Sequence, residues 1–141
     1  MTDIRWMSGS DSDAVVAASH LFDDPVQPEL AADFVNRSGH HIAIAYVDDE
    51  PAGFVSGVEI AHPDKAVEML LYELGVDDAF HGRGIGKALV AALRDRAAEL
   101  GCRGMWVLTD HDNEAAVRTY QSAGGSDLQP QVLIEWDLTQ G

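Results

Sequence analysis

Basic residues are scarce in this sequence: 9 Lys and Arg stand against 24 Asp and Glu, which gives a formal net charge of -15. An accumulation of negative charge repels the phosphate backbone of nucleic acids, so we expect no nucleic-acid partner. Cysteine is also nearly absent. The single residue, Cys102, cannot form an internal disulfide and is expected to be a small core residue rather than a nucleophile.

Long apolar runs are missing as well. No stretch reaches the length needed to span a bilayer, and the first residues, Met1 to Arg5, lack the pattern of a signal peptide. We therefore expect no membrane association and a cytoplasmic location. The 141 residues, 46% of them hydrophobic, suit one soluble domain over residues 1–141 with a sizeable core.

The charge is distributed unevenly along the chain. Residues 1–82 carry 16 acidic and 3 basic residues, whereas residues 83–141 carry 8 acidic and 6 basic ones. The acidic part would attract cations, and the basic residues gather beside and after a glycine-rich stretch. On the charge alone, an ordinary acidic, soluble surface is the better explanation.

Hydrophobic periodicity predicts an α/β chain of alternating helices and strands. The expected order of elements is ααβββαβαβ. Helices are predicted over 10–22, 28–35, 85–100 and 113–123, and strands over 42–46, 52–60, 67–76, 105–109 and 132–138.

The most informative stretch joins the third predicted strand to the third predicted helix. Gly82, Gly84 and Gly86 lie at this junction together with Arg83 and Lys87. Glycine permits positive φ and close approach of a ligand to the backbone, and a helix N-terminus offers unpaired N–H groups with partial positive charge. The stretch predicts an anion cradle, most naturally for a phosphate or pyrophosphate. A plain glycine-rich loop with two solvated cations is the alternative.

Two familiar phosphate-binding motifs do not fit this stretch. A P-loop places Ser or Thr after its lysine, whereas Ala88 follows Lys87. A dinucleotide fingerprint needs the spacing Gly-x-Gly-x-x-Gly, and the spacing here is Gly-x-Gly-x-Gly.

A second group of polar residues follows the strand predicted over 105–109. Asn113, Ala116 and Tyr120 fall on one helical face at spacings of three and four, which suits a ligand lying against the helix. A capping asparagine, a packing alanine and a half-buried tyrosine are the structural alternative. Asp110 lies at a strand end, where open sheets bind ligands.

The His81-x-x-Gly84-x-Gly86 loop and the Asn113-x-x-Ala116-x-x-x-Tyr120 helix, with the order of elements, resemble the GNAT family of acetyl-coenzyme A-dependent N-acetyltransferases. The resemblance implies a mixed, mostly antiparallel twisted sheet flanked by helices, with a splay between the fourth and fifth strands. The family usually has Arg or Gln at the position of His81, whose imidazole can still donate to a phosphate.

A closer resemblance is to the class I aminoglycoside 3-N-acetyltransferases. It rests on Leu71-Tyr72-Glu73-Leu74-Gly75-Val76, on the ten-residue step from Asp110 to Tyr120, and on the ending Leu133-Ile134-Glu135-Trp136-Asp137-Leu138. The subfamily often has more carboxylates directly after Asp110, a role that Asp112 and Glu114 fill approximately.

The resemblance implies acetyl-CoA as cosubstrate and no metal. The pantetheine arm would lie in the splay, with the Leu74 N–H polarising the thioester carbonyl. Backbone amides of the glycine loop would hold the pyrophosphate. The implied cofactor-binding residues are Leu74, Gly75, Val76, His81, Gly82, Arg83, Gly84, Ile85, Gly86, Lys87, Asn113 and Ala116.

Catalytic roles follow from the same resemblance. Asp110 is the first choice as the base that takes a proton from the amine, with Glu73 as the competing base; each has a purely structural or ammonium-binding alternative. Tyr120 would protonate the leaving thiolate. Asp110, Asp112, Glu114 and Glu73 are the implied substrate contacts.

The expected acceptor is a cationic small-molecule amine, foremost the 3-amino group of an aminoglycoside. Polyamines, amino acids and protein N-termini are the alternatives within the enzyme class. A non-catalytic acetyl-CoA-binding module is the alternative outside it. A homodimer is expected from the family and the apolar last strand.

Overall fold

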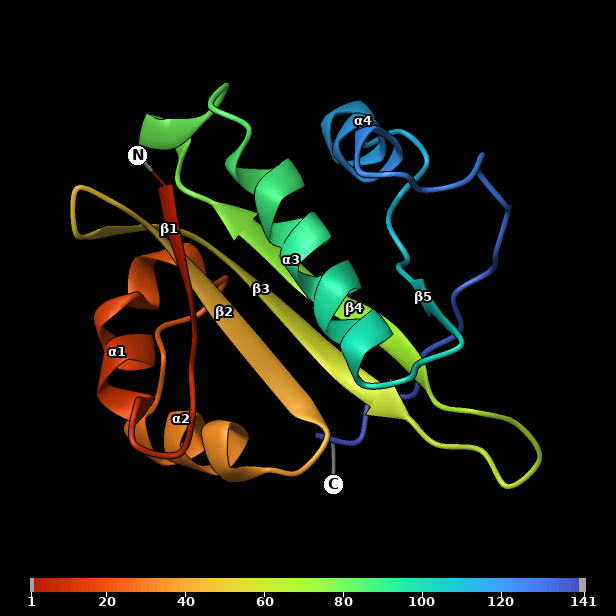
Figure 1. The fold of residues 1–141 in the computed structure, drawn as a ribbon, viewed down its shortest axis with the longest axis horizontal. Helices are drawn as coiled ribbons and strands as arrows, with labels where there is room; N and C mark the ends of the chain where they lie inside the picture. Colours follow the sequence, from red (N-terminus) through yellow and green to blue (C-terminus); the bar gives the residue numbers. More distant parts are fainter. Residues whose placement is uncertain (1, 140–141) are drawn as a thin grey trace.

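The computed structural model describes residues 2–139, and Figure 1 shows their arrangement. One sheet of five strands runs in the order β1-β2-β3-β4-β5. The strands are β1 (Thr2–Trp6), β2 (His40–Val47), β3 (Glu50–Ile60), β4 (Glu68–Val76) and β5 (Gly104–Trp106). The α-helices are α1 (Ser12–Ala17), α2 (Pro28–Asn36), α3 (Ile85–Glu99) and α4 (Glu114–Ser122), and two short 3-10 helices are η1 (Ser19–Leu21) and η2 (Asp78–Phe80).

The sheet is mixed. β1 to β4 pair antiparallel, and β4 pairs with β5 in parallel. That last pairing begins at Glu68 opposite Gly104 and stops at Leu70 opposite Trp106, so the second half of β4 has no strand on its β5 side. The expected mixed, mostly antiparallel sheet with a splay between β4 and β5 is confirmed.

Helices cover both faces of the sheet because successive strand residues point to opposite sides. Ala43 and Ala45 of β2 face α3, which contributes Leu89 and Leu93 to one core. The alternate residues of β2 face α1 and α2 and form a second core, with members Ile42, Ile44, Tyr46, Val15, Ala18, Ala31 and Phe54.

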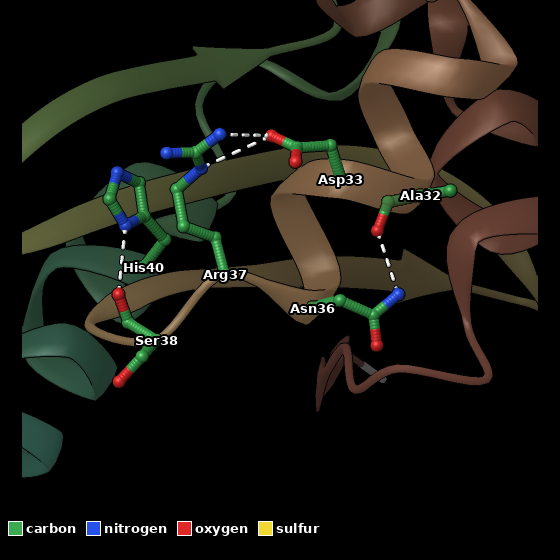
Figure 2. A network of polar contacts seen from close by, with 6 residues as sticks. All are labelled: Ala32, Asp33, Asn36, Arg37, Ser38 and His40. Carbon is green, nitrogen blue, oxygen red and sulfur yellow. Dashed lines mark hydrogen bonds and ion pairs between the residues drawn. The ribbon is translucent and has the colours of Figure 1, made fainter.

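The end of α2 is fixed by polar contacts that Figure 2 shows. Asn36 Nδ2 donates to the Ala32 carbonyl at 2.8 Å, and the Arg37 guanidinium binds Asp33 at 2.7 Å. His40 Nδ1 lies 3.2 Å from the Ser38 carbonyl, at the start of β2. The Asn36 and His40 contacts engage backbone carbonyls where the chain turns from α2 into the sheet, and the Arg37–Asp33 pair joins two side chains one turn apart.

The structure differs from the sequence prediction near the N-terminus. Residues 2–6 form β1, which the prediction missed, because the short alternation of Ile4 and Trp6 with polar residues gave a weak signal. The helix predicted over 10–22 ends at Ala17, and a 3-10 turn follows. That turn brings Leu21 and the next residues against β4.

The C-terminal segment is the largest difference. The predicted strand over 132–138 is wrong: these residues belong to no helix or strand and their apolar side chains are exposed. The strand predicted over 105–109 is reduced to Gly104–Trp106, because β5 has only β4 as a neighbour. Over residues 2–139 the structure has no helix that is both long and apolar enough to cross a bilayer.

Candidate active site

A cleft of about 880 Å³ opens where β4 separates from β5. Its walls come from the second half of β4, the loop after η1, the glycine loop before α3, and α4. Elements far apart in sequence therefore meet at one place. The cleft includes most of the cofactor-binding residues predicted from the sequence, namely Leu74, Gly75, Val76, His81, Gly82, Gly84, Ile85, Gly86, Lys87, Asn113 and Ala116.

The backbone of β4 presents hydrogen-bonding groups to this cleft. The Asp77 N–H donates to the Ala52 carbonyl of β3, so the residue pair Asp77 and Ala52 is hydrogen-bonded. Hydrogen-bonded and non-bonded pairs alternate in an antiparallel ladder. The backbone groups of Val76 and Leu74 therefore point away from β3 and into the splay, where an extended ligand can pair with them as a strand would.

The glycine loop adopts the conformation that an anion cradle needs. Gly82 and Gly84 have φ values of +80° and +75°, and a Cβ added at either position would meet nothing within 4 Å. Glycine is therefore needed there for its backbone conformation rather than for space. Gly86, within the first turn of α3, has another role: a Cβ there would lie 3.3 Å from Thr119 Cγ2, so its small size lets α4 approach.

Cationic and imidazole groups surround the cradle. Lys87 and Arg118 line the cleft, whereas Arg83 lies outside its lining with its guanidinium 5.2 Å from the Phe80 ring. His81 Nε2 lies 3.1 Å from the Val76 carbonyl, which can only accept, so this nitrogen donates. His81 thus ties the loop to β4, and its Nδ1 donates to an anion only when the ring is protonated.

Replacing Gly84 with Ala should weaken binding of coenzyme A by about tenfold, because a left-handed alanine costs roughly 1–2 kcal/mol and the relaxed loop loses its cradle. The matched control is Gly101→Ala at the other end of α3, where φ is +80° and a Cβ also meets open space. Thermal melting should show similar destabilisation for both variants. Calorimetric titration should show weaker binding for the Gly84 variant alone; equal affinity in the two variants would contradict a cradle at Gly84.

Two carboxylates also line the cleft. Glu73 lies on β4 opposite Ser56 of β3, and Asp23 lies on the loop after η1; both line the cleft. Burial raises the pKa of Glu73, and the negative charge of Asp23 raises it further. A half-buried carboxylate with a raised pKa is suited to accept a proton from an amine. Over residues 2–139 no group of three or more His, Cys, Asp and Glu side chains could hold a metal ion.

The loop that carries Asp23 is held firmly on the sheet. The Phe22 ring stacks on Phe54 of β3 with centroids 4.1 Å apart. The Leu21 carbonyl packs on Gly75, where a Cβ would come within 2.8 Å of it. Asp23 is therefore positioned by its neighbours, although its own side chain is exposed.

Tyr120 faces the cleft from α4. Asn113 caps this helix by accepting a hydrogen bond from the Ala116 N–H at 3.2 Å. Two residues of the predicted motif, Asn113 and Ala116, therefore define where the helix begins. Burial raises the pKa of Tyr120, which keeps the phenol protonated at neutral pH. A protonated phenol beside the cleft can donate to a leaving group.

Some of the predicted residues lie outside the cleft lining. Asp110, Asp112 and Glu114 are exposed, and the Glu114 carboxylate lies 4.0 Å from the Arg118 guanidinium. In the other direction, the sequence prediction missed Asp23 and Arg118. The signal that could have found Arg118 is its position four residues after Glu114, a spacing typical of a helical ion pair. No comparable signal in the sequence shows that the loop of Asp23 folds against β4.

The fold and this cleft define a class of acyltransferase-like α/β proteins, and the chain belongs to one family within it. The model of the acetyltransferase (GNAT) family matches residues 6–124. The chain is 31% identical over 109 residues to the L-2,4-diaminobutyric acid acetyltransferase of Streptomyces coelicolor. That match covers 74% of this chain and 58% of the relative, so the chain spans little more than half of that protein.

Two solved structures are similar in fold. An aminoglycoside acetyltransferase, meta-AAC0020 from an uncultured soil metagenomic sample in complex with sisomicin, superposes with a TM-score of 0.89 at 18% identity. The match covers 97% of this chain and 96% of that one. Aminoglycoside N-acetyltransferase AAC(6')-Iy in complex with CoA gives a TM-score of 0.78 at 19% identity, with 96% and 95% covered. Similarity at this identity shows a shared fold.

Proposed function

We propose that this protein transfers an acetyl group from acetyl-CoA to a primary amine of a small cationic molecule. The observation that carries the proposal is a single cleft that combines three features. These are the edge of β4 that has no neighbouring strand, the glycine cradle at the start of α3, and a carboxylate and a phenol in the lining. The cradle suits the anionic pyrophosphate of coenzyme A, and the edge of β4 suits its extended pantetheine arm. The carboxylate and the phenol suit the proton transfers of the acetyl-transfer reaction.

The residues present fit coenzyme A as a ligand. Gly82 and Gly84 form a cradle whose N–H groups suit a pyrophosphate, with Lys87 beside it. Leu74 and Val76 direct backbone groups into the splay, which suits a pantetheine amide chain. When bound, acetyl-CoA supplies an activated acetyl thioester. The Leu74 N–H would donate to the thioester oxygen, where negative charge develops during attack.

The two proton transfers are assigned to Glu73 and Tyr120, which both line the cleft. Glu73 accepts a proton from the acceptor ammonium, which frees the amine lone pair for attack. Tyr120 donates its proton to the departing thiolate, so charge is balanced at both ends of the reaction. Glu73 is preferred to Asp110 as the base because it lines the cleft and its pKa is raised, whereas Asp110 is exposed outside it.

The acceptor proposed first is an aminoglycoside, modified at the 3-amino group as the sequence resemblance implies. Two carboxylates, Glu73 and Asp23, lie at the acceptor end, and an acceptor with several ammonium groups would engage both. The structural neighbours named as aminoglycoside acetyltransferases support this class. A small diamine such as diaminobutyrate is the second candidate, favoured by the S. coelicolor relative.

The deciding experiment is a thiol-release assay with acetyl-CoA against aminoglycosides, diaminobutyrate, polyamines, simple amino acids and peptides. Mass spectrometry and NMR of the product identify the acetylated nitrogen. Turnover of gentamicin-like compounds at the 3-amino group supports the first proposal, and preference for diaminobutyrate supports the second. Coenzyme A binding without turnover of any amine would identify a non-catalytic binding module instead.

Replacing Asp23 with Asn should raise KM for acceptors with two or more ammonium groups by about two- to fivefold, the range expected for one exposed charge pair. KM for a monoamine should stay unchanged. The matched control is Asp24→Asn, because Asp24 is adjacent and exposed but does not line the cleft. Steady-state kinetics at low and high salt test this; equal effects of both variants on all acceptors would rule out specific recognition by Asp23.

A further inference from the structure

A buried hydroxyl without a partner lies next to the cleft. Ser56 of β3 is 1% exposed, and over residues 2–139 its Oγ has no hydrogen-bond partner. Buried hydroxyl groups in folded proteins are almost always hydrogen-bonded, because an unsatisfied one has lost its contacts with water without replacing them. The neighbours of Ser56 therefore decide which group its hydroxyl can serve.

The strand register places Ser56 directly beside Glu73. Ser56 pairs with Ile42 of β2 on one side and with Glu73 of β4 on the other. Side chains directly opposite each other in an antiparallel pair share a face, with Cβ atoms roughly 4.5–5.5 Å apart. Phe54, two residues earlier in β3, shares this face, and both Phe54 and Glu73 line the cleft. The Ser56 side chain therefore lies next to two residues of the cleft lining.

A β-bulge sets this alignment. Gly57 pairs with Leu71, yet Ser56 pairs with Glu73, so Tyr72 is an extra residue in β4. Without the bulge, Tyr72 would lie opposite Ser56, and Glu73 would point to the face that α3 covers. Bulges redirect side chains and are frequent beside active sites. Here the bulge brings the Glu73 side chain onto the face of the Ser56 hydroxyl.

We propose that Ser56 is a positioning residue for Glu73: its hydroxyl donates a hydrogen bond to one carboxylate oxygen and leaves the other oxygen for the acceptor ammonium. The separation can be spanned, because the carboxylate is carried by two flexible methylene groups directly opposite the Ser56 Cβ. The inference rests on the function proposed above, in which Glu73 takes the proton. A hydrogen bond from β3 gives that base a fixed orientation toward the amine.

The contact favours the charged form of the Glu73 carboxyl. A hydrogen bond to an ionised acceptor is roughly twice as strong as one between neutral groups. Donation by Ser56 therefore lowers the pKa of Glu73, against burial and the charge of Asp23, which both raise it. The other titratable or charged side chains of the cleft lining are Tyr72, His81, Lys87, Arg118 and Tyr120. Removing the hydroxyl should thus move the titration of Glu73 to higher pH.

An NMR titration of the Glu73 carboxyl carbon, assigned by the loss of its signal in Glu73→Gln, measures this shift. The midpoint in Ser56→Ala should rise by about half to one pH unit, because the carboxylate loses a hydrogen-bond donor. Ser56→Thr keeps a hydroxyl and should restore the wild-type midpoint. The matched control is Ser122→Ala, since Ser122 lines the cleft but its hydroxyl already donates to the Thr119 carbonyl at 2.8 Å. An unchanged midpoint in Ser56→Ala would overturn the inference.

Kinetics of the same variants separate this inference from the proposed function, because the titration needs no turnover. If Glu73 is the base, kcat/KM of Ser56→Ala should be about three- to tenfold below wild type on the acid limb and approach it at high pH. In the Glu73→Gln background, Ser56→Ala should have no further effect. A titration that moves while the pH–rate profile does not would confirm the contact and reject Glu73 as the base. A serine with a purely structural role would leave both unchanged and overturn the inference.

Discussion

The variant Tyr120→Phe should lose about 100-fold in kcat while its KM for acetyl-CoA stays nearly constant, in keeping with the usual contribution of a positioned general acid. Phenylalanine keeps the aromatic ring that lines the cleft and removes only the hydroxyl. Because burial raises the pKa of Tyr120, the hydroxyl carries its proton across the neutral range and is available to the thiolate. Steady-state kinetics with acetyl-CoA as the varied substrate measure the effect.

The control for this prediction is Tyr72→Phe. Tyr72 also lines the cleft but is 63% exposed, and its variant should keep full kcat. A further check uses an acetyl thioester whose thiol has a lower pKa, because such a thiolate leaves without a proton. The loss in Tyr120→Phe should shrink with that donor; an equal loss with both donors would show that the hydroxyl is not the acid.

The variant Glu73→Gln should lower kcat/KM by roughly 100-fold or more at neutral pH, because glutamine cannot accept the proton of the acceptor ammonium. In the wild type, kcat/KM should fall as pH drops through the pKa of Glu73. Since burial and Asp23 raise that pKa, the decline should begin above the range of an ordinary glutamate. The variant should lack this acid limb, which a pH–rate profile measures.

The same substitution should make the protein more stable at neutral pH. A carboxyl with a raised pKa holds its proton more tightly in the folded than in the unfolded chain, so its contribution to stability is present at low pH and is lost as pH rises. Removing the charge removes that loss. Melting temperatures of Glu73→Gln and wild type should therefore converge in acid and separate toward neutral pH, with the variant higher.

Asp110→Asn is the comparison that decides between the two candidate bases. Asp110 is exposed and lies outside the cleft lining, so we expect nearly normal kcat and an intact acid limb. If Asp110→Asn loses the limb and Glu73→Gln retains it, the base assignment is reversed.

The sequence predicted the central part of the fold well. Strong alternation in residues 42–46 and 52–60 and the helical spacing of Ile85, Leu89 and Leu93 correspond to β2, β3 and α3, and all three helical residues are buried. Prediction failed where stability comes from neighbours rather than from the local pattern. β1 has a weak pattern and exists because it pairs with β2, whereas residues 132–138 have a strong pattern and no strand beside them.

The parts of the candidate site that are formed by residues close together in the sequence were predictable, and those formed by distant segments were not. The glycine cradle and the Asn113-to-Tyr120 helix depend on nearby residues, and both lie in the cleft. The loop that carries Asp23 is held near Glu73 by the stacking of Phe22 on Phe54, a contact between distant segments that no spacing reveals. Asp110 lies outside the cleft lining for a related reason: β5 ends at Trp106, so the residues after it leave the sheet earlier than the pattern indicated.

The separation of β4 from β5 has a consequence for the protein before it meets any ligand. Leu74 directs its peptide groups into the splay, whereas the Val76 carbonyl already accepts from His81. Peptide groups that lack a strand partner attract strands of other molecules as readily as they attract a pantetheine chain. Empty protein would therefore be the form most prone to aggregate. A ligand that occupies the splay also adds stability in proportion to its concentration. The supply of acetyl-CoA in a cell would then govern how much of the protein stays usable, besides how fast it works.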